Sequence, residues 1–314
     1  MEENNFVVIG DTILDRFLYG DAVRISPEAP ALVLDVLEEK HSVGGAFNVF
    51  SHISNLGGTA KLITVTGDDI GKYADDFTEL RTHEKDLILF KDRSRVTSIK
   101  TRLVALYKLS YLARFDKEVK KEISIEFEEM ILETVAQHLN HNSSLLIVDY
   151  NKGVVTKRLS QELIKMARLT QAKVYVDTKK DDIAPYKGSY LLKPNKVEFQ
   201  EIKLRYQLSA YDDLEASRKL LEEFDLSNIV LTLGSQGILA VSRNGEIVSA
   251  PAHEVAVKEL SGAGDSVLAV LATLISSGHS LRTALEAANN VAACFISSGV
   301  SYRARREDLF KKWQ

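Results

Sequence analysis

The sequence predicts an α/β fold, in which a mostly parallel central sheet is covered by helices on both faces and a smaller group of strands lies outside it. Three observations support this expectation. Short apolar runs alternate with helical patterns along most of the 314 residues, which is typical of parallel sheets. Polar loops follow many of the expected strands, where such sheets bind their ligands. The chain also lacks an internal repeat or a long linker that would divide it.

The first third of the chain already shows this alternation. Residues 6–9 form an apolar run that ends in a glycine and an aspartate, which predicts a buried strand leading into a loop. Residues 32–37 and 61–65 are further strand candidates. Between them, residues 44–56 predict a helix that begins at a glycine pair, because apolar side chains recur there at helical spacing.

The middle of the chain is less regular. Segments 87–90, 96–106 and 107–115 are rich in β-branched and aromatic residues and alternate weakly, so we expect strands outside the main sheet. From residue 123 onward, the expected helices are 123–139, 158–169, 195–202, 214–223, 264–276 and 281–297, and the expected strands are 145–148, 174–176, 190–192 and 229–233. Strands 238–241 and 247–249 are joined by Asn244-Gly245, a strong hairpin signal.

Composition limits the classes of function. The net charge is −4 and the isoelectric point is about 6.0, so we expect no nucleic-acid partner. No apolar run is long enough for a membrane span, and the polar start is unlike a signal peptide. The single cysteine, Cys294, cannot form an internal disulfide, and no Cys/His pattern has zinc spacing. These features favour a protein of the reducing cytoplasm.

The stretch SGAGD (261–265) combines two chemical features directly before an apolar helix. Glycines let backbone N–H groups approach a ligand, and a helix N-terminus attracts anions. Asp265 is favoured in the first turn and is expected to stay ionised there, so it could accept a proton. Ser261 is the expected helix cap. The stretch suits phosphoryl transfer to a hydroxyl, but it equally suits a glycine turn before a core helix.

Other nucleotide motifs are absent. GDDIGK (67–72) has the wrong spacing for a P-loop and lacks the Ser or Thr after its lysine. No HRD-type catalytic loop or DFG motif occurs. No GxGxxG follows the first strand, which weighs against a dinucleotide-binding oxidoreductase.

Taken together, the motifs identify a resemblance along nearly the whole chain. In order they are GDTILD (10–15), Gly44-Gly45 followed by Asn48, KPNKVEF (193–199), TLGSQG (232–237) and GAGD (262–265). This set resembles the ribokinase-type (PfkB) carbohydrate kinases. The resemblance implies a ribokinase-like three-layer α/β sandwich over 1–314, with a small β-sheet lid formed by about 16–40 and 94–115.

Three longer segments narrow the resemblance further. Residues 10–36, 148–156 and 176–199 are similar to bacterial heptose-7-phosphate kinases, and RISPEAP (24–30) is the most telling piece. Those kinases phosphorylate the anomeric hydroxyl of D-glycero-D-manno-heptose 7-phosphate, on the route to nucleotide-activated heptose for surface polysaccharide. Some carry a nucleotidyltransferase domain after the kinase. This chain ends at Gln314, so we expect the kinase alone.

The resemblance also implies roles for particular residues. Asp265 would be the base, and the amides of Gly262, Ala263 and Gly264 would form an anion hole. Asn195 and Glu198 would organise Mg²⁺. The implied sugar contacts are Asp15, Gly44, Gly45 and Asn48, and the implied ATP contacts are Lys193, Asn195, Thr232, Gly234, Gly237 and Asn289. Asp149 and Asp177 each end an expected strand, so we expect Asp149 to face the sugar and Asp177 to face ATP. Asp11 suits either a sugar contact or a turn. The resemblance leaves open whether the protein also requires a monovalent cation.

A phosphorylated substrate needs cations as well, because a guanidinium fork matches phosphate geometry. The candidates are Arg24, Arg102, Arg114 and Lys152, although each arginine also suits a solvated lid surface. The chain departs from the family at GGAFNVF (44–50), where Phe47 and Phe50 replace small residues. Phe47 beside Asn48 could either reshape the sugar pocket or pack in the core. Lys193 stands where the family commonly has asparagine.

Two alternatives therefore stay open. The first is the same chemistry on another sugar, sugar phosphate or nucleoside. The second is a sugar- or nucleotide-binding regulator that has lost catalysis, which the intact GAGD stretch disfavours. Lid strands expose edges and apolar faces that commonly need cover, so we also expect a homodimer joined through the lids.

Overall fold

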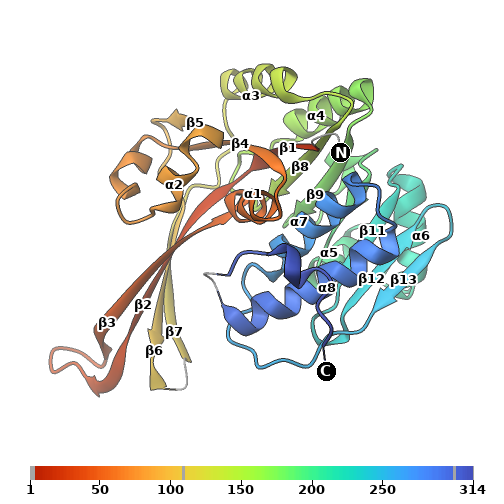
Figure 1. Ribbon diagram of the computed structural model, residues 1–314. Helices are drawn as coiled ribbons and strands as arrows, with labels where there is room; N and C mark the ends of the chain where they lie inside the picture. The colour runs from red at the N-terminus through yellow and green to blue at the C-terminus, as the bar shows by residue number, and fades with distance from the viewer. Residues whose placement is uncertain (1–3, 108–109, 300–301, 314) are drawn as a thin grey trace.

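The computed structural model describes residues 4–107, 110–299 and 302–313. Its centre is a nine-stranded sheet with the strand order β13-β12-β11-β10-β9-β8-β1-β4-β5 (Figure 1). The strands from β11 to β5 run parallel, and β12 and β13 form an antiparallel edge. The strands are β1 (Asn5–Gly10), β4 (Thr59–Gly67), β5 (Leu87–Asp92), β8 (Ser143–Asp149), β9 (Lys173–Thr178), β10 (Leu191–Leu192), β11 (Asn228–Thr232), β12 (Ile238–Ser242) and β13 (Ile247–Ala250).

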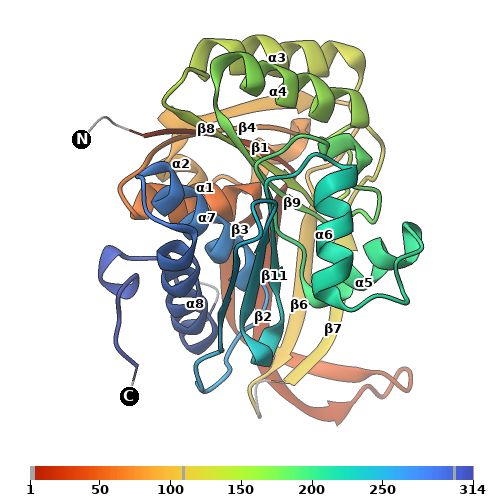
Figure 2. The ribbon, with the colours of Figure 1, turned by 90° about the vertical axis from the view of Figure 1, so that its right-hand side faces the viewer.

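Helices cover both faces of this sheet because successive strand residues point in opposite directions. Phe6 and Val8 of β1 belong to a buried cluster with α1 (Ala46–Asn55), α7 (Ala263–Ser276) and α8 (Leu281–Ser298). Val7 and Ile9 belong to the opposite cluster, which contains residues of α3 (Ile125–His138), α4 (Lys157–Thr170), α5 (Lys196–Arg205) and α6 (Asp213–Glu223). The view in Figure 2 separates the two helical layers. The expected three-layer α/β architecture is confirmed.

A second sheet of four strands projects from this body (Figure 1). Its order is β3-β2-β6-β7, with β2 (Thr12–Ile25), β3 (Leu32–Gly45), β6 (Ile99–Ala105) and β7 (Ser110–Lys117). The strands β2 and β6 are parallel, whereas β2–β3 and β6–β7 are antiparallel. We call this four-stranded sheet the lid.

Two sequence expectations for this region were wrong or incomplete. Residues 87–90 were expected outside the main sheet, but β5 pairs with β4 at its edge. Both of its faces are packed against the helical layers, so the weak alternation reflects burial on two sides. The local pattern did not predict the 14-residue strand β2, because its alternation is broken by charged residues, although the family resemblance placed most of it in the β-sheet lid. Of the expected strand 107–115, residues 108–109 lie outside the described part.

Within the described residues, no helix combines the length and the apolar character that crossing a membrane requires. A short helix, α2 (Glu79–Thr82), lies between β4 and β5. The remaining helices agree with the sequence expectations to within a few residues at their ends.

Candidate active site

The start of α7 is formed by a glycine that no other residue could replace without strain. Gly262 is the N-cap residue, with a left-handed φ of 101°, and no side-chain hydrogen bond caps the helix. A Cβ atom at Gly262 would lie 2.8 Å from the Phe295 ring and 2.9 Å from the Asn48 amide nitrogen. The expectation that Ser261 caps the helix is therefore wrong, because the chain turns through the left-handed region one residue later.

The backbone N–H groups of this turn are only partly free to bind an anion. The Asp265 N–H donates to the Gly262 carbonyl at 3.1 Å, while the Ala263 N–H makes only a long contact of 3.4 Å with the Leu260 carbonyl. The predicted anion hole formed by the amides at 262–264 therefore remains a prediction.

Asp265 is held from two sides. Its Oδ2 accepts a 2.8 Å hydrogen bond from the Asn48 side chain on α1, and its Oδ1 accepts a 2.7 Å bond from the Tyr150 hydroxyl after β8. Burial raises the pKa of Asp265 to about 6, aided by the nearby charge of Asp177 and opposed by the two hydrogen bonds and Lys179. The carboxylate is therefore still mostly ionised at pH 7, as the sequence led us to expect, but its pKa lies above the usual value because desolvation outweighs the hydrogen bonds and Lys179.

On one side of Asp265 lies a narrow cavity of about 40 Å³ beneath the lid. Its polar lining contains Asp15, Asn48, Lys100, Arg102 and the glycine pair 44–45. Arg102 and Asp15 form a 2.5 Å ion pair, and the guanidinium lies 4.9 Å from the centre of the Phe17 ring. Gly44 permits this arrangement, since a Cβ atom there would lie 2.3 Å from an Asp15 oxygen. We call this the sugar-side cavity.

On the other side lies a much larger pocket of about 850 Å³. It is lined by the loops after β9, β10 and β11 and by α7 and α8, and it includes the predicted ATP contacts Asp177, Lys193, Asn195, Thr232, Gly234, Gly237 and Asn289. The Asn289 amide donates to the Pro251 carbonyl at 2.7 Å, which ties this wall to the segment after β13. We call this the nucleotide-side pocket.

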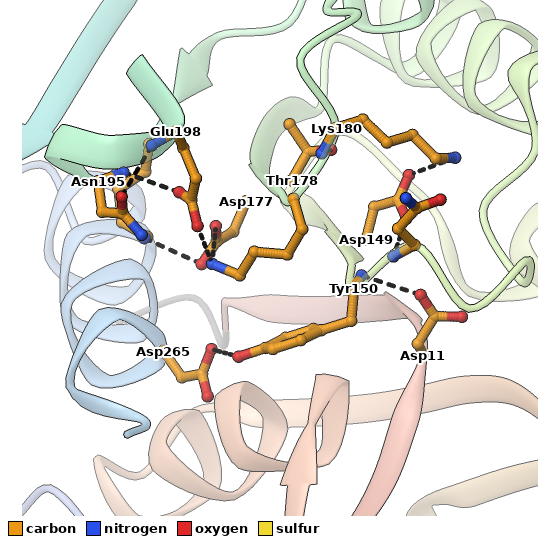
Figure 3. A network of polar contacts seen from close by, with 12 residues as sticks. Asp11, Asp149, Tyr150, Asp177, Thr178, Lys180, Asn195, Glu198 and Asp265 are labelled. Carbon is orange, nitrogen blue, oxygen red and sulfur yellow. Dashed lines mark hydrogen bonds and ion pairs between the residues drawn. The ribbon is translucent and has the colours of Figure 1, made fainter. Parts of the chain in front are cut away.

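Two lysines neutralise the carboxylates Asp177 and Glu198 of the nucleotide-side pocket, which lie close together in Figure 3. Lys193 lies 2.9 Å from Asp177, and both side chains are almost completely buried. Lys179 lies 2.6 Å from Glu198 and 3.5 Å from Asp177. Lys193 and Lys179 lower the pKa of Asp177 against the opposing effect of burial. A phosphate entering the pocket would therefore meet ammonium groups rather than bare carboxylates.

The predicted metal residues are engaged with each other. Asn195 caps α5 by accepting a bond from the Glu198 N–H at 3.0 Å, and Glu198 accepts a bond from the Asn195 N–H at 2.8 Å. The described residues include no group of three or more His, Cys, Asp or Glu side chains able to hold a metal ion. Because Mg²⁺ is usually held by one or two carboxylates plus substrate phosphates, these residues fit an ion that arrives with ATP rather than a preformed cage.

Two predicted sugar contacts lie away from both cavities. Asp11 is buried and accepts three backbone N–H bonds, from Tyr150, Lys152 and Val154. Asp149 is fully buried and lies 2.8 Å from the Lys180 ammonium. Neither side chain lines a cavity, so the contacts support a role for each in holding the loop after β8. Both carboxylates are buried among protein donors and open to neither of these cavities, so their predicted contacts with the sugar are not supported.

Three predicted phosphate cations do not line the sugar-side cavity and are paired with carboxylates instead. Arg24 forms an exposed 2.8 Å pair with Asp35, Arg114 bonds Asp116 at 2.9 Å, and Lys152 lies 2.5 Å from Glu118. Only Arg102 of this group lines the sugar-side cavity. The bulky Phe47 and Phe50 are fully buried and pack on each other and on His83. They line neither cavity, so the sequence concern that they reshape the sugar pocket is not supported.

Sequence reasoning missed three residues that the fold brings to the site. Tyr150 lines both cavities, Lys100 lines the sugar-side cavity and Lys179 lines the nucleotide-side pocket. Lys100 could have been found, because it stands two residues before Arg102 and alternate residues of a strand share a face. No pattern in the sequence indicates that the Tyr150 hydroxyl reaches Asp265, 115 residues away.

Comparison with known proteins identifies a matching family and similar proteins. A family model described as pfkB family carbohydrate kinase matches residues 114–305. Among curated proteins, the bifunctional protein HldE of Rhodopseudomonas palustris strain BisB18 is 37% identical over 304 residues, which cover 97% of this chain and 62% of that protein. HldE of Helicobacter pylori strain J99 is 32% identical over 305 residues, covering 96% and 65%. The chain therefore spans about three fifths of the length of these relatives.

Solved structures share the fold at lower identity. Phosphofructokinase-2 from Escherichia coli, in complex with potassium, superimposes with a TM-score of 0.79 at 17% identity, covering 98% of this chain and 97% of that one. Ribokinase from Thermotoga maritima gives a TM-score of 0.73 at 20% identity, covering 97% of each chain. The ribokinase-like fold class, including the separate small sheet, is confirmed.

Proposed function

The chain belongs to the pfkB family of carbohydrate kinases, and we propose that it transfers the γ-phosphoryl group of ATP to the anomeric hydroxyl of a heptose 7-phosphate. The observation that carries the proposal is the position of Asp265. This single carboxylate forms part of both the sugar-side cavity and the nucleotide-side pocket, as a base between an acceptor hydroxyl and a phosphoryl donor must.

In the proposed reaction, the sugar hydroxyl oxygen forms a bond to the γ-phosphorus while the bond from that phosphorus to the β,γ-bridging oxygen breaks. ADP leaves with the electron pair of the broken bond, and Asp265 takes the hydroxyl proton. A carboxylate with a pKa of about 6 is mostly ionised at pH 7 and still basic enough to accept a proton. The product is heptose 1,7-bisphosphate.

The negative charge of the transferred phosphoryl group must be stabilised by fixed hydrogen-bond donors or cations. We assign this task to the amides at 262–264 and to Lys193, whose Nζ lies near the helix start, 3.2 Å from the place of a Cβ on Gly264. Mg²⁺ bound with ATP would neutralise phosphate charge, with Asn195 and Glu198 as the proposed residues near it. A monovalent cation remains a proposal carried over from the family resemblance.

The heptose phosphate is supported by sequence resemblance and by the cations of the lid. Segments 10–36, 148–156 and 176–199 resemble heptose-7-phosphate kinases, and HldE proteins are relatives over nearly the whole chain. Lys100 and Arg102 bring two positive side chains to the sugar-side cavity, where we propose that they meet the phosphate of the substrate. The product would then serve the synthesis of nucleotide-activated heptose for surface polysaccharide.

The sugar-side cavity is too small for a sugar as it stands. Its volume of about 40 Å³ compares with roughly 300–1,000 Å³ for typical ligand pockets. We therefore propose that the lid, meaning the segments near 16–40 and 94–115, opens to admit the sugar and closes to exclude water.

We also propose that the protein is a homodimer joined through the lids and works in the cytoplasm. Apolar side chains remain exposed on the lid, among them Val23 (84% exposed), Ile25, Leu37 and Phe115, and the only cysteine is unpaired. Light scattering at micromolar concentration is expected to give the mass of a dimer. A monomer would contradict the interface.

The substrate is tested by measuring ADP release with Mg-ATP. D-glycero-D-manno-heptose 7-phosphate is compared with the unphosphorylated heptose, fructose, ribose and adenosine, and Asp265→Asn serves as the control for contaminating kinase or ATPase. We expect turnover of the phosphorylated heptose alone. Turnover of a different sugar would support a kinase activity but contradict heptose 7-phosphate as the substrate. Binding of these compounds without turnover would favour a regulator that has lost catalysis.

A further inference from the structure

We propose that Tyr150 is a positioning residue for phosphoryl transfer, which holds the Asp265 carboxylate through its hydroxyl and is itself held by Asp11. The inference rests on the proposed function only in taking Asp265 as the base. It links two residues that the sequence singled out, Asp11 and Asp265, through a third that it did not.

The first link is the contact between Tyr150 and Asp265. The hydroxyl donates to Oδ1 at 2.7 Å (Figure 3). The Asn48 amide donates to the other oxygen, Oδ2, at 2.8 Å. Burial and the charge of Asp265 raise the pKa of Tyr150 well above its usual value, so the hydroxyl keeps its proton and acts as the donor. With one donor on each oxygen, the carboxylate plane is fixed, and each oxygen retains a lone pair for a substrate proton.

The second link is the anchoring of Tyr150 by Asp11. Asp11 stands directly after β1, and Oδ2 accepts the N–H of Tyr150 at 2.9 Å and of Lys152 at 3.1 Å. Its other oxygen accepts the N–H of Val154 at 3.1 Å. The carboxylate therefore organises the whole turn after β8, which would otherwise leave buried N–H groups unpaired. This explains why a buried aspartate follows β1 without reaching the sugar-side cavity.

The third observation is the position of the Tyr150 ring between the two cavities, both of which it lines. The Lys100 ammonium from the lid lies 5.8 Å from the ring centre, and the Lys179 ammonium from the loop after β9 lies 5.2 Å away. Cations at this distance are attracted to an aromatic face. Tyr150 thus contacts Lys100 of the sugar-side cavity and Lys179 of the nucleotide-side pocket, as well as Asp265, which lines both.

The groups around Asp265 determine whether loss of the Tyr150 hydroxyl raises or lowers the pKa of Asp265. Asp177 raises the pKa of Asp265, whereas Lys179 and the two hydrogen bonds lower it. The charge of Asp15 in the lid raises the pKa of Tyr150. Removing the Tyr150 hydroxyl removes one interaction that favours the ionised form. The pKa of Asp265 is therefore expected to rise, by about 0.5 to 1 unit for a single hydrogen bond.

The test compares wild type with Tyr150→Phe, which keeps the ring and removes the hydroxyl. Tyr175→Phe is the matched control, because Tyr175 is also buried and its hydroxyl lies 3.4 Å from Ser276, outside both cavities. In the kinase assay, we expect the acid limb of the kcat profile to move to higher pH in Y150F, with a loss of about two- to fivefold at pH 6 and almost none at pH 8. Y175F should keep the wild-type limb.

A second measurement does not depend on activity. Carbon-13 NMR of protein labelled at the aspartate carboxyl carbons, with the Asp265→Asn spectrum to identify the signal, follows the titration of Asp265 directly. This separates Asp265 from Asp11, whose pKa burial also raises to about 6. We expect the Asp265 titration to move upward in Y150F and to stay in place in Y175F.

An unmoved Asp265 titration in folded Y150F would overturn the inference, as would a loss of kcat that is equal at every pH. Thermal melting checks that both variants fold. If the titration moves as expected but no sugar is turned over by the wild type, the proposed function fails while the positioning role of Tyr150 stands.

Discussion

The two cavities that meet at Asp265 are built in different ways. The sugar-side cavity has about 40 Å³ and is lined by charged and polar side chains from the lid and α1, whereas the nucleotide-side pocket has about 850 Å³ and is lined largely by glycine-containing loops and apolar helix residues. They share only Tyr150, Ser261, Gly262 and Asp265 among the lining residues described. The nucleotide-side pocket is already open in this structure, whereas access to the sugar-side cavity is proposed to require lid movement.

This comparison predicts that variants separate into three kinds: those at the shared residues, those that affect one substrate, and those that affect neither. The most informative measurements are the KM for the sugar and the KM for ATP in the same variant. A variant that shifts both equally would argue against two independently built cavities.

The largest effect is expected from Asp265→Asn at the shared boundary. The amide cannot take the hydroxyl proton, so kcat should fall about a thousandfold, while both KM values change little. Single-turnover kinetics with the preferred sugar measure the chemical step. Turnover near the wild-type rate would rule out Asp265 as the base.

Next is Lys193→Met, in the nucleotide-side pocket. The Lys193–Asp177 pair is almost completely buried, and removal of one partner leaves a buried charge uncompensated. The free energy of unfolding should fall by about 3 kcal/mol, measured by urea denaturation. The partly solvated Lys179→Met is the comparison, and an equal loss in both variants would show that burial of the pair does not matter.

Arg102→Ala should act on the sugar side alone. It removes the guanidinium that pairs with Asp15 at 2.5 Å and faces the cavity, so the sugar KM should rise about 10- to 100-fold. The KM for ATP should stay within about twofold on the same scale. Equal changes in both constants would mean that Arg102 supports the fold rather than the substrate.

Asn289→Ala should act on the nucleotide side alone, and more weakly. Its amide holds the Pro251 carbonyl at 2.7 Å, and the loss of one neutral hydrogen bond should raise the KM for ATP about three- to tenfold. The sugar KM in the same variant is the internal control. An unchanged KM for ATP would remove Asn289 from the nucleotide contacts.

The smallest effect is expected from Arg24→Ala in the outer lid. Arg24 and Asp35 form an exposed pair, with about half of each side chain accessible, and such pairs contribute roughly 0–1 kcal/mol. Both KM values and kcat should remain within about twofold of wild type. A tenfold rise in the sugar KM would instead mean that lid closure, or a second subunit, brings Arg24 to the substrate.

Much of the fold could be predicted from local pattern. The buried strands β1, β8 and β11, the helices α7 and α8 and the hairpin of β12 and β13 follow the apolar periodicity and turn residues directly. The edge strand β5 could not be assigned to the main sheet in this way, because its apolar pattern is compatible with either sheet. Only its pairing with β4 decides between them.

The candidate active site likewise combines features that are local in the sequence with contacts between distant segments. By itself, the sequence determined that Asp265 follows a glycine turn at the head of a helix, since that chemistry lies within four consecutive residues. Tertiary structure alone decided that Asn48 and Tyr150 reach this carboxylate, across 217 and 115 residues. It also decided that Asp11 supports a loop and that Arg24 does not line the sugar-side cavity. The physical reason is that helix caps and strand periodicity are local interactions, whereas the partners of a buried polar group are chosen by whichever distant segments the packed sheet brings within hydrogen-bond distance.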